Sequence, residues 1–247
     1  MRAKERLNEI IKILNKQGRV HVRDLSSRFQ VTEDLIRKDL KKLELEGLID
    51  RIHGGAERKK QKFDAPNIRY RMQVNQTDKT LIAQKAIKLI KNGDTIFLDT
   101  SSTCLSLAKA LAQSSLELTV ITNMLDAVHM LEDQEDIRLV LVGGLYNRQM
   151  GGFFGQDVIE GLGAYQVDYS FISCTGIDLD QGCLLSSTKD IAYTKKVMLD
   201  NSRQRVCLLE TRKFNNQGLV KFYDLEGLDY LVLDKPYDLD DMDVKIL

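Results

Sequence analysis

The chain has 247 residues, 43% of them hydrophobic, and its 36 Lys and Arg balance 36 Asp and Glu to a formal net charge of zero. This length and apolar content predict a sizeable buried core, divided between one small and one larger domain. A neutral chain taken as a whole argues against binding to nucleic acid, but the charge is unevenly distributed. Residues 1–62 hold 17 Lys and Arg against 10 Asp and Glu, a net of +7, whereas the remainder holds 19 against 26, a net of −7. A basic N-terminal part on an acidic body is typical of a DNA-binding domain joined to a second domain.

The sequence gives little support for membrane insertion or for cofactor chemistry. No apolar run approaches the ~18 residues that cross a bilayer, and the charged N-terminus lacks the apolar stretch of a signal peptide, so we expect a cytoplasmic protein without membrane contact. The cysteines are far apart and include no C-x-x-C pair, which predicts neither a zinc site nor a disulfide framework. We therefore expect no metal and no cofactor. The four cysteines are Cys104, Cys174, Cys183 and Cys207.

Three short helices are predicted at the N-terminus. Apolar residues recur at helical spacing over residues 7–14, residues 20–22 form a short extended link, and residues 22–29 form a second helix. A tight turn at Gln30-Val31 leads into the third helix. This arrangement matches a helix-turn-helix.

The third helix has two contrasting faces. Thr32 is a suitable N-cap, and Gly47 is a suitable residue just beyond the last turn. At about 100° per residue, Ile36, Leu40 and Leu43 share one face, and the opposite face is cationic. An ordinary surface helix with a solvated charged face would look the same, but the two helices before it favour a helix that reads DNA. The extended residues that follow it are expected to form a wing.

These residues resemble a known family. Residues 31–40, VTEDLIRKDL, and residues 51–56, RIHGGA, together with Arg6, resemble the DNA-binding domain of the DeoR family of bacterial transcriptional regulators. Leu35 departs from the threonine that the family usually has at this position. The resemblance implies a winged helix-turn-helix whose third helix docks in the major groove. The residues expected at the DNA are Arg6, Thr32, Glu33, Arg37, Lys38, Lys41, Lys42, Arg51, His53 and Gly54.

The rest of the chain divides into a linker and a larger domain. Residues 1–57 are predicted to form the DNA-binding domain, residues 58–78 a polar, basic linker, and residues 79–247 an α/β domain. Short apolar strands alternate with helical segments, which predicts a doubly wound, mostly parallel sheet covered on both faces. The expected strands cover residues 95–98, 118–121, 137–142, 169–174, 206–209 and 230–233, and the expected helices cover residues 82–90, 105–111, 125–131, 156–162 and 191–201.

Polar loops follow several of these strands, at the edge where such sheets bind ligands. Residues 99–103, DTSST, follow the first strand and open a helix, so their hydroxyl groups and the helix N–H groups can form a cradle for an anion. An ordinary Ser/Thr N-cap explains the same residues equally well. Thr122-Asn123, Gly143-Gly144 and residues 174–178 follow later strands, and Lys213 follows another. Because the carboxyl ends of parallel strands meet at one edge, we expect these loops to converge.

The loops also resemble the DeoR sensor domain. The resemblance implies a fold related to ribose-5-phosphate isomerases and the binding of a phosphorylated sugar. Ser101 stands where the family usually has glycine, and Glu210 and Arg212 replace the usual Asp and Ser. The residues expected at the effector are Lys79, Asp99, Ser101, Ser102, Thr103, Thr122, Asn123, Gly143, Gly144, Gly176, Asp178 and Lys213.

The sequence favours a regulator over an enzyme. An aldose–ketose isomerase needs a carboxylate base supported by further acids, whereas Asp99 has no second carboxylate in the neighbouring loops, so no catalytic residue is assigned. We expect a homo-oligomeric repressor of carbohydrate-metabolism genes, a dimer or tetramer, that binds double-stranded operator DNA under the control of a phosphorylated sugar. One alternative is a sugar-phosphate isomerase or transferase-like enzyme with an appended interaction head. Another is an activator, which would share all of these features.

Overall fold

The computed structural model describes residues 3–45, 48–58, 67–237 and 244–247, and the chain forms two compact units, residues 1–70 and 71–247. Gly47 and the basic residues 59–62 lie outside the described residues. The linker predicted over residues 58–78 is partly helical, because α4 (Ile68–Gln73) and the start of α5 (Gln76–Ala86) fall within it. A six-residue helix is too short to show an apolar period in the sequence.

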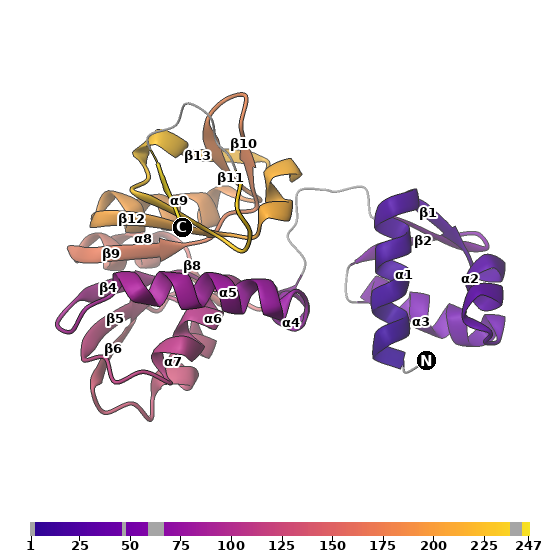
Figure 1. Cartoon of the computed structure of the whole chain (residues 1–247), viewed down its shortest axis with the longest axis horizontal. Helices are drawn as coiled ribbons and strands as arrows, with labels where there is room; N and C mark the ends of the chain where they lie inside the picture. The colour runs from indigo at the N-terminus through magenta and orange to yellow at the C-terminus, as the bar shows by residue number, and fades with distance from the viewer. Residues whose placement is uncertain (1–2, 46–47, 59–66, 238–243) are drawn as a thin grey trace. The chain divides into compact units, whose positions relative to one another are not determined.

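The N-terminal unit is a three-helix domain with a small antiparallel sheet (Figure 1). Apolar residues of all three helices pack into one core, Ile10, Leu25 and Ile36 among them. The predicted helix-turn-helix and wing are confirmed. The helices are α1 (Ala3–Gln17), α2 (Val22–Phe29) and α3 (Glu33–Leu45), and the strands, in spatial order, are β1 (Arg19–His21), β3 (Gly55–Arg58) and β2 (Ile49–Ile52).

A seven-stranded parallel sheet forms the centre of the C-terminal unit, in the order β15-β14-β12-β9-β4-β5-β6. This confirms the predicted doubly wound sheet. From β4 the chain builds outward through β5 to β6, and then from β9 through β12 to β14 and β15 on the other side, so the order reverses between β4 and β9. Ligands bind such sheets at the carboxyl ends of the strands beside this reversal. The strands are β4 (Thr95–Leu98), β5 (Leu118–Thr122), β6 (Ile137–Leu141), β9 (Val167–Ile172), β12 (Ser202–Leu209), β14 (Tyr230–Leu233) and β15 (Lys245–Ile246).

Helices cover both faces of this sheet (Figure 1). α5, α6 (Ser102–Leu111) and α7 (Leu125–Leu131) lie on one side, and α8 (Gln156–Gly163) and α9 (Lys189–Asp200) on the other. Burial on both faces explains the apolar runs within the central strands, such as residues 96–98 of β4 and 206–209 of β12. None of the helices in the described ranges is both long and apolar enough to span a membrane. Short 3-10 helices complete the unit: η1 (Ile87–Leu89), η2 (Thr211–Asn215) and η3 (Leu225–Gly227).

Two smaller β structures were not predicted. The glycine-rich segment after β6 contains a hairpin of β7 (Leu145–Asn147) and β8 (Gly152–Phe154), and a three-stranded antiparallel sheet forms from β10 (Gly176–Asp178), β11 (Cys183–Ser186) and β13 (Val220–Asp224). These strands are three to five residues long. They are too short for a reliable alternating pattern, and the pairing of β11 with β13 depends on contacts between distant parts of the chain.

A buried ion pair joins α1 to α3. Arg6 Nε donates a hydrogen bond to Asp39 Oδ2 at 2.6 Å, and Arg6 Nη2 donates one to Asp39 Oδ1 at 3.2 Å. Both residues are buried, at 4% and 7% exposure. A bidentate pair of this kind fixes the orientation of both side chains, and so it fixes α3 against α1.

Removing one member of this pair should destabilise the N-terminal unit. Arg6→Ala leaves the Asp39 carboxylate buried without its partner, which costs about 3–5 kcal/mol. Hydrogen exchange of the full-length protein should therefore show faster exchange across α1 and α3, with α6 and α9 unchanged. Arg28→Ala, which removes an exposed arginine of α2, is the control and should leave exchange as in the wild type. Equal protection in Arg6→Ala and Arg28→Ala would contradict this role of the pair.

Candidate DNA-binding and effector sites

α3 presents its cationic face to solvent. Arg37, Lys38, Lys41 and Lys42 are exposed, whereas the apolar side chains of the opposite face are buried in the domain core. Leu35, at the position where the family has threonine, is half-buried. The predicted separation of the two faces is confirmed.

The turn before α3 fixes where this helix starts. Gln30 adopts the left-handed conformation, with φ 53° and ψ 48°, and its N–H caps the end of α2 by donating to Ser27 O at 3.4 Å. Thr32 Oγ1 then accepts a hydrogen bond from Leu35 N at 3.3 Å, as expected of an N-cap. The turn therefore combines a backbone cap at the end of α2 with a side-chain cap at the start of α3.

Carboxylates in the first turn of α3 hold Arg37. Its Nη2 lies 2.6 Å from Glu33 Oε2, and its Nη1 lies 2.7 Å from Asp34 Oδ1. Glu33 also lies 3.9 Å from Arg23 of α2. These exposed pairs contribute little to stability, but they orient the Arg37 fork along the N-terminal end of the helix.

The structure places Arg6 differently from the other residues predicted to contact DNA. Its guanidinium is buried against Asp39, which argues against direct contact with a phosphate or a base. Arg6 instead supports α3 from α1, through its hydrogen bonds to Asp39.

The wing presents a polar turn. His53 and Gly54 are exposed between β2 and β3, and Gly54 has a φ of 75°, which favours glycine. Arg51 lies 3.8 Å from Glu44 of α3, which ties the wing to the helix. A Cβ on Gly55 would lie only 2.0 Å from Val20 O, so β3 can approach β1 only with glycine here.

In the C-terminal unit, Asp99 occupies the point where the strand order reverses. It follows β4, it is 1% exposed, and its Oδ2 accepts a hydrogen bond from Ser173 N, just after β9, at 3.2 Å. Lys195 Nζ of α9 donates to the same oxygen, and this lysine is also buried. Lys195 was not predicted as a site residue, because a lysine inside a helix resembles a solvated one until the fold brings it to Asp99.

The hydroxyl loop caps α6. Ser101 Oγ accepts a hydrogen bond from Cys104 N at 3.0 Å, and its φ of −149° shows that serine replaces the family's glycine without backbone strain. Ser102 and Thr103 are buried in the first turn of α6, and within the described part of the chain Thr103 Oγ1 has no hydrogen-bond partner. Cys104 behaves as a core thiol, because burial raises its pKa to about 12.

Thr122 and Asn123 serve the scaffold of the loop. Thr122 Oγ1 donates to Leu98 O at 2.6 Å, which locks β5 to β4. Asn123 accepts a hydrogen bond from Thr100 Oγ1 at 2.8 Å and donates to Phe153 O at 2.7 Å. Their side chains are therefore satisfied within the protein, and they position the residues 99–103 loop against the β7–β8 hairpin.

The remaining predicted residues have local roles. A Cβ on Gly144 would lie 2.6 Å from Val158 Cγ2, and one on Gly176 would lie 2.1 Å from Asn216 O, so both glycines permit close packing. Gly143 is exposed. Asp178 accepts two hydrogen bonds from Gln181, which closes the β10–β11 turn. Within the described residues, none of these contacts involves Asp99 or Lys213.

A cluster of cations surrounds Glu210, which is 1% exposed. Arg212 donates to it through Nε at 2.9 Å and Nη2 at 3.1 Å, Asn75 Nδ2 donates at 2.8 Å, and Lys213 Nζ lies 3.9 Å away. Burial opposes ionisation of Glu210, but Lys213 and Arg212 hold the pKa of its carboxyl below the usual value. Glu210 is thus a charged anchor.

Lys213 bridges this cluster to the end of β9. Its Nζ donates to Ser173 Oγ at 3.1 Å and to Cys174 O at 3.2 Å. Burial lowers the pKa of Lys213, and Glu210 opposes that shift. Lys213, in η2, and Asp99, after β4, therefore contact the same residue, Ser173.

Lys79 is held by backbone oxygens. It is 2% exposed, and its Nζ donates to Arg71 O and to Val74 O, the latter at 2.6 Å. Burial lowers its pKa from 10.5 to about 8, with Glu210 opposing the shift. Burial likewise lowers the pKa of Arg71 to about 10, while Asp99 and Glu210 act in the opposite direction. In this region Lys195 pairs with the buried Asp99, and Arg212 and Lys213 lie beside the buried Glu210.

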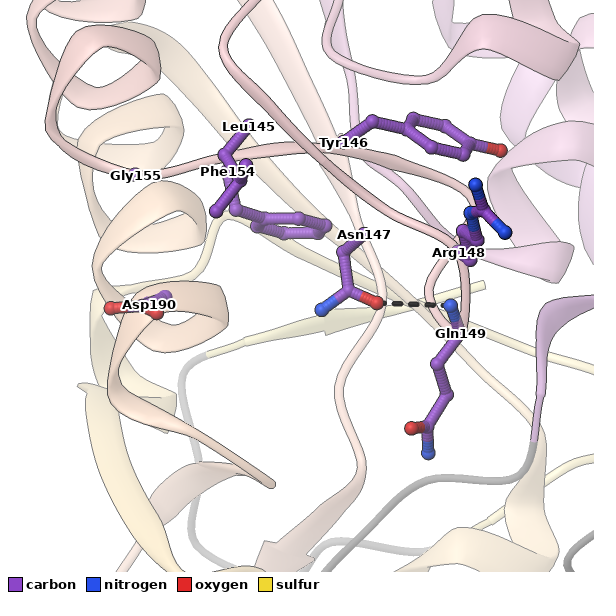
Figure 2. Close-up of a pocket in the computed structure, with 8 residues that line it drawn as sticks. All are labelled: Leu145, Tyr146, Asn147, Arg148, Gln149, Phe154, Gly155 and Asp190. Atoms are coloured by element: carbon purple, nitrogen blue, oxygen red, sulfur yellow. Dashed lines mark hydrogen bonds between the residues drawn. The ribbon is translucent and has the colours of Figure 1, made fainter.

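A separate cavity of about 410 Å³ lies beside the β7–β8 hairpin (Figure 2). Hairpin residues line it, including Tyr146 and Arg148, together with Asp190 at the start of α9. None of the predicted effector residues lines it. The cationic side chains gather instead in the buried cluster around Asp99 and Glu210. In the described ranges, no group of three or more His, Cys, Asp or Glu is arranged to hold a metal ion.

The fold and the two sites together define a transcription regulator with an α/β sensor domain. The chain belongs to the DeoR family: residues 6–62 match the DeoR-like helix-turn-helix domain, and residues 74–235 match the DeoR C terminal sensor domain.

Similar proteins span nearly the whole chain. The HTH-type transcriptional regulator YulB of Bacillus subtilis is 35% identical, over 98% of this chain and 95% of that protein. The glycerol-3-phosphate regulon repressor of Escherichia coli is 31% identical, over 96% and 92%. The lactose phosphotransferase system repressor of Streptococcus mutans is 32% identical, over 95% and 93%. Among solved structures, ribose 5-phosphate isomerase A from Methanocaldococcus jannaschii is 22% identical over 55% of this chain and 52% of that chain, with a TM-score of 0.40.

The lowered pKa of Lys79 makes stability depend on pH. Between about pH 8 and pH 10.5 the unfolded chain holds a proton that the folded chain has lost, so the free energy of unfolding rises with pH over this window. Below about pH 8 the folded state carries the full cost of the buried charge. Urea unfolding should therefore show that, as the pH rises through this window, the free energy of unfolding of the wild type increases relative to that of Lys79→Met. Lys109→Met, at an exposed lysine of α6, is the control, and a difference for Lys79→Met that stays constant with pH would contradict the assignment.

Proposed function

We propose that this protein is a repressor of carbohydrate-metabolism genes and that a phosphorylated sugar controls its binding to operator DNA. The observation that carries the proposal is the excess of cations at the strand-order reversal of the sensor domain, in a chain that also presents a basic α3. Two of the relatives bear the names of a glycerol-3-phosphate regulon repressor and a lactose phosphotransferase system repressor, which supports regulation of sugar genes.

The DNA-binding part of the proposal rests on α3. Arg37 offers a planar fork suited to a guanine edge, and Lys38, Lys41 and Lys42 suit phosphates or bases. Glu33 and Asp34 hold the Arg37 fork before binding, so little side-chain entropy is lost when it meets a base. The wing residues Arg51, His53 and Gly54 are the second contact surface. Recognition of a palindromic operator requires at least two copies, and we therefore propose a homo-oligomer. As a regulator of operator DNA, it would act in the cytoplasm.

The effector part of the proposal rests on charge. A phosphate ester carries about two negative charges near neutral pH, and a site with surplus cations, hydroxyl groups and the N-terminus of α6 suits it. Lys213, Lys195, Ser102 and Thr103 are the residues that we assign to phosphate recognition. Free sugars lack the charge that this cluster needs.

Binding without turnover follows from the state of Asp99. A general base must be available to take a proton, but the Asp99 carboxylate already accepts hydrogen bonds from Lys195 and from Ser173 N. Among the described contacts, no second carboxylate lies beside Asp99. The other buried carboxylate of the region, Glu210, is engaged by Arg212 and Asn75. These contacts favour a switch over an isomerase or a transferase.

Operator binding should depend on the α3 cations and on salt. With an operator selected from a random DNA pool by the full-length protein, fluorescence anisotropy should show affinity falling steeply with salt, because bound phosphates release counterions. Arg37→Ala should weaken binding by about 10- to 100-fold, and Lys41→Gln should reduce the salt slope by about 1.

Arg138→Ala, which removes an exposed arginine of β6, serves as the matched control. It should bind the operator as the wild type does. Salt-independent binding, or equal loss in Arg37→Ala and Arg138→Ala, would refute the assignment of α3.

A phosphorylated sugar should stabilise the protein and release the operator. Sugar phosphates from a panel should raise the melting temperature of the full-length protein, since binding to the folded state adds RT ln(1 + [L]/Kd), whereas the matching free sugars should not. Lys213→Gln should lose most of this response because it removes a central cation. Lys109→Gln, at an exposed lysine of α6, should retain it.

The same samples also test for turnover. NMR spectra of the effective sugar phosphate should stay unchanged during incubation with the protein. Sustained conversion to a product would overturn the proposal that the sensor domain binds without catalysis, and equal stabilisation by free sugars would overturn the role of the cations.

A further inference from the structure

α3 carries one apolar side chain that the core of its domain does not account for. Leu35 is half-buried, and the family resemblance assigns no contact to it, because the family usually has threonine at this position. A single leucine at a surface needs no explanation by itself, so the surroundings of Leu35 decide its role. Among the described residues, the half-buried apolar side chains that pack against the core do not include Leu35; they are Ile11, Ile13, Phe29, Val31 and Leu48.

Leu35 lies at the border between the two faces of α3. At about 100° per residue it is about 60° from Lys38 and about 20° from Lys42 around the helix axis, and both lysines are exposed. Ile36, the next residue, is instead buried in the core of the domain. Leu35 therefore stands at the edge of the cationic surface that the proposed function assigns to DNA.

The first turn of α3 fixes the backbone of Leu35. Its N–H donates to Thr32 Oγ1 at 3.3 Å and to Thr32 O at 3.1 Å. One turn further along the helix, Asp39 is held by Arg6 of α1. In a helix-turn-helix, residues near the N-terminal end of the recognition helix meet the base edges. Leu35 is the third residue of α3 (Glu33–Leu45) and belongs to that end.

The chemistry of a leucine restricts what it can contact in the major groove. Its side chain has no donor and no acceptor, so it cannot bind a phosphate or hydrogen-bond to a base. A polar base edge beside Leu35 would lose water without gaining a hydrogen bond. The apolar group that a base pair presents in this groove is the C5-methyl group of thymine. The base that suits Leu35 is therefore thymine.

We propose that Leu35 reads one thymine in each operator half-site, through contact between its side chain and the C5-methyl group. This inference rests on the proposed function, in which α3 enters the major groove, and it adds a base that the chain selects. Arg37 and the lysines of α3 supply the charged contacts of the same surface. Leu35 contributes no charge, so its effect falls on the choice of sequence.

The test removes the methyl group from the DNA and the side chain from the protein, separately and together. The operator that the full-length wild type selects from a random pool is made with each thymine replaced in turn, in both half-sites, by deoxyuridine. Deoxyuridine keeps the hydrogen-bonding edge of thymine and lacks only the C5-methyl group. Leu35→Ala shortens the side chain, and Leu35→Met keeps an apolar one of similar length. Leu45→Ala, at a leucine of α3 that is 79% exposed, is the matched control.

One thymine of the half-site should respond differently from the others. There, deoxyuridine should weaken binding of the wild type by about fourfold per half-site in fluorescence anisotropy, as expected for losing contact with one buried methyl group. Leu35→Met and Leu45→Ala should show the same loss. Leu35→Ala should bind both DNAs equally, because the contact is already absent. Repeating the selection with Leu35→Ala should no longer enrich thymine at this position.

The outcomes separate this inference from the proposed function. If the wild type selects an operator but no deoxyuridine weakens its binding, or if Leu35→Ala shows the same loss as the wild type, the role of Leu35 is overturned and the proposed function stands. Leu35→Ser, a second short variant, is judged by the same criterion, so the result does not depend on the folding of one variant. If the wild type enriches no sequence from the pool, the proposed function fails first, and this inference fails with it.

Discussion

The sensor domain depends on one buried ion pair, between Asp99 and Lys195. Moving two charges out of water is costly, and a buried pair persists only when further hydrogen bonds complete it. Here Ser173 N donates to the same carboxylate oxygen of Asp99. The pair therefore joins the end of β4, the end of β9 and the middle of α9 at the reversal of strand order. Lys213 reaches the site through Ser173, so its position follows from that of Asp99.

The DNA-binding domain uses the same device. Arg6 and Asp39 form a buried pair between α1 and α3, beneath the exposed cations of the reading helix. In both domains a buried Asp–cation pair fixes a helix, and the side chains suited to a ligand stand on that helix or beside it. Rigid support of this kind limits the entropy that the contacting side chains lose on binding.

Periodic features of the chain could be predicted from sequence, and contacts across the fold could not. The two faces of α3 and the apolar strands reflect burial, and burial leaves a periodic pattern of apolar residues that can be recognised in the sequence. Lys195 was missed because a lysine within a helix looks solvated until the tertiary structure places it against Asp99. The family resemblance likewise placed Arg6 at the DNA and Asp178 at the effector. In the structure Arg6 is buried, and Asp178 closes the turn of its own hairpin.

The departures from the family pattern are explained by local geometry. Ser101 takes an extended φ and caps α6 with its hydroxyl, so the loss of glycine leaves the loop unstrained. The side chain of Glu210 reaches Asn75 and Arg212 at once, and Arg212 in turn neutralises part of its charge. The substitution of Asp and Ser by Glu and Arg is therefore paired: each new side chain is the partner of the other. A ligand that meets this edge encounters Arg212 already committed to a carboxylate. Under the proposed function, discrimination among phosphorylated sugars at this edge therefore depends on how readily the Arg212–Glu210 pair opens.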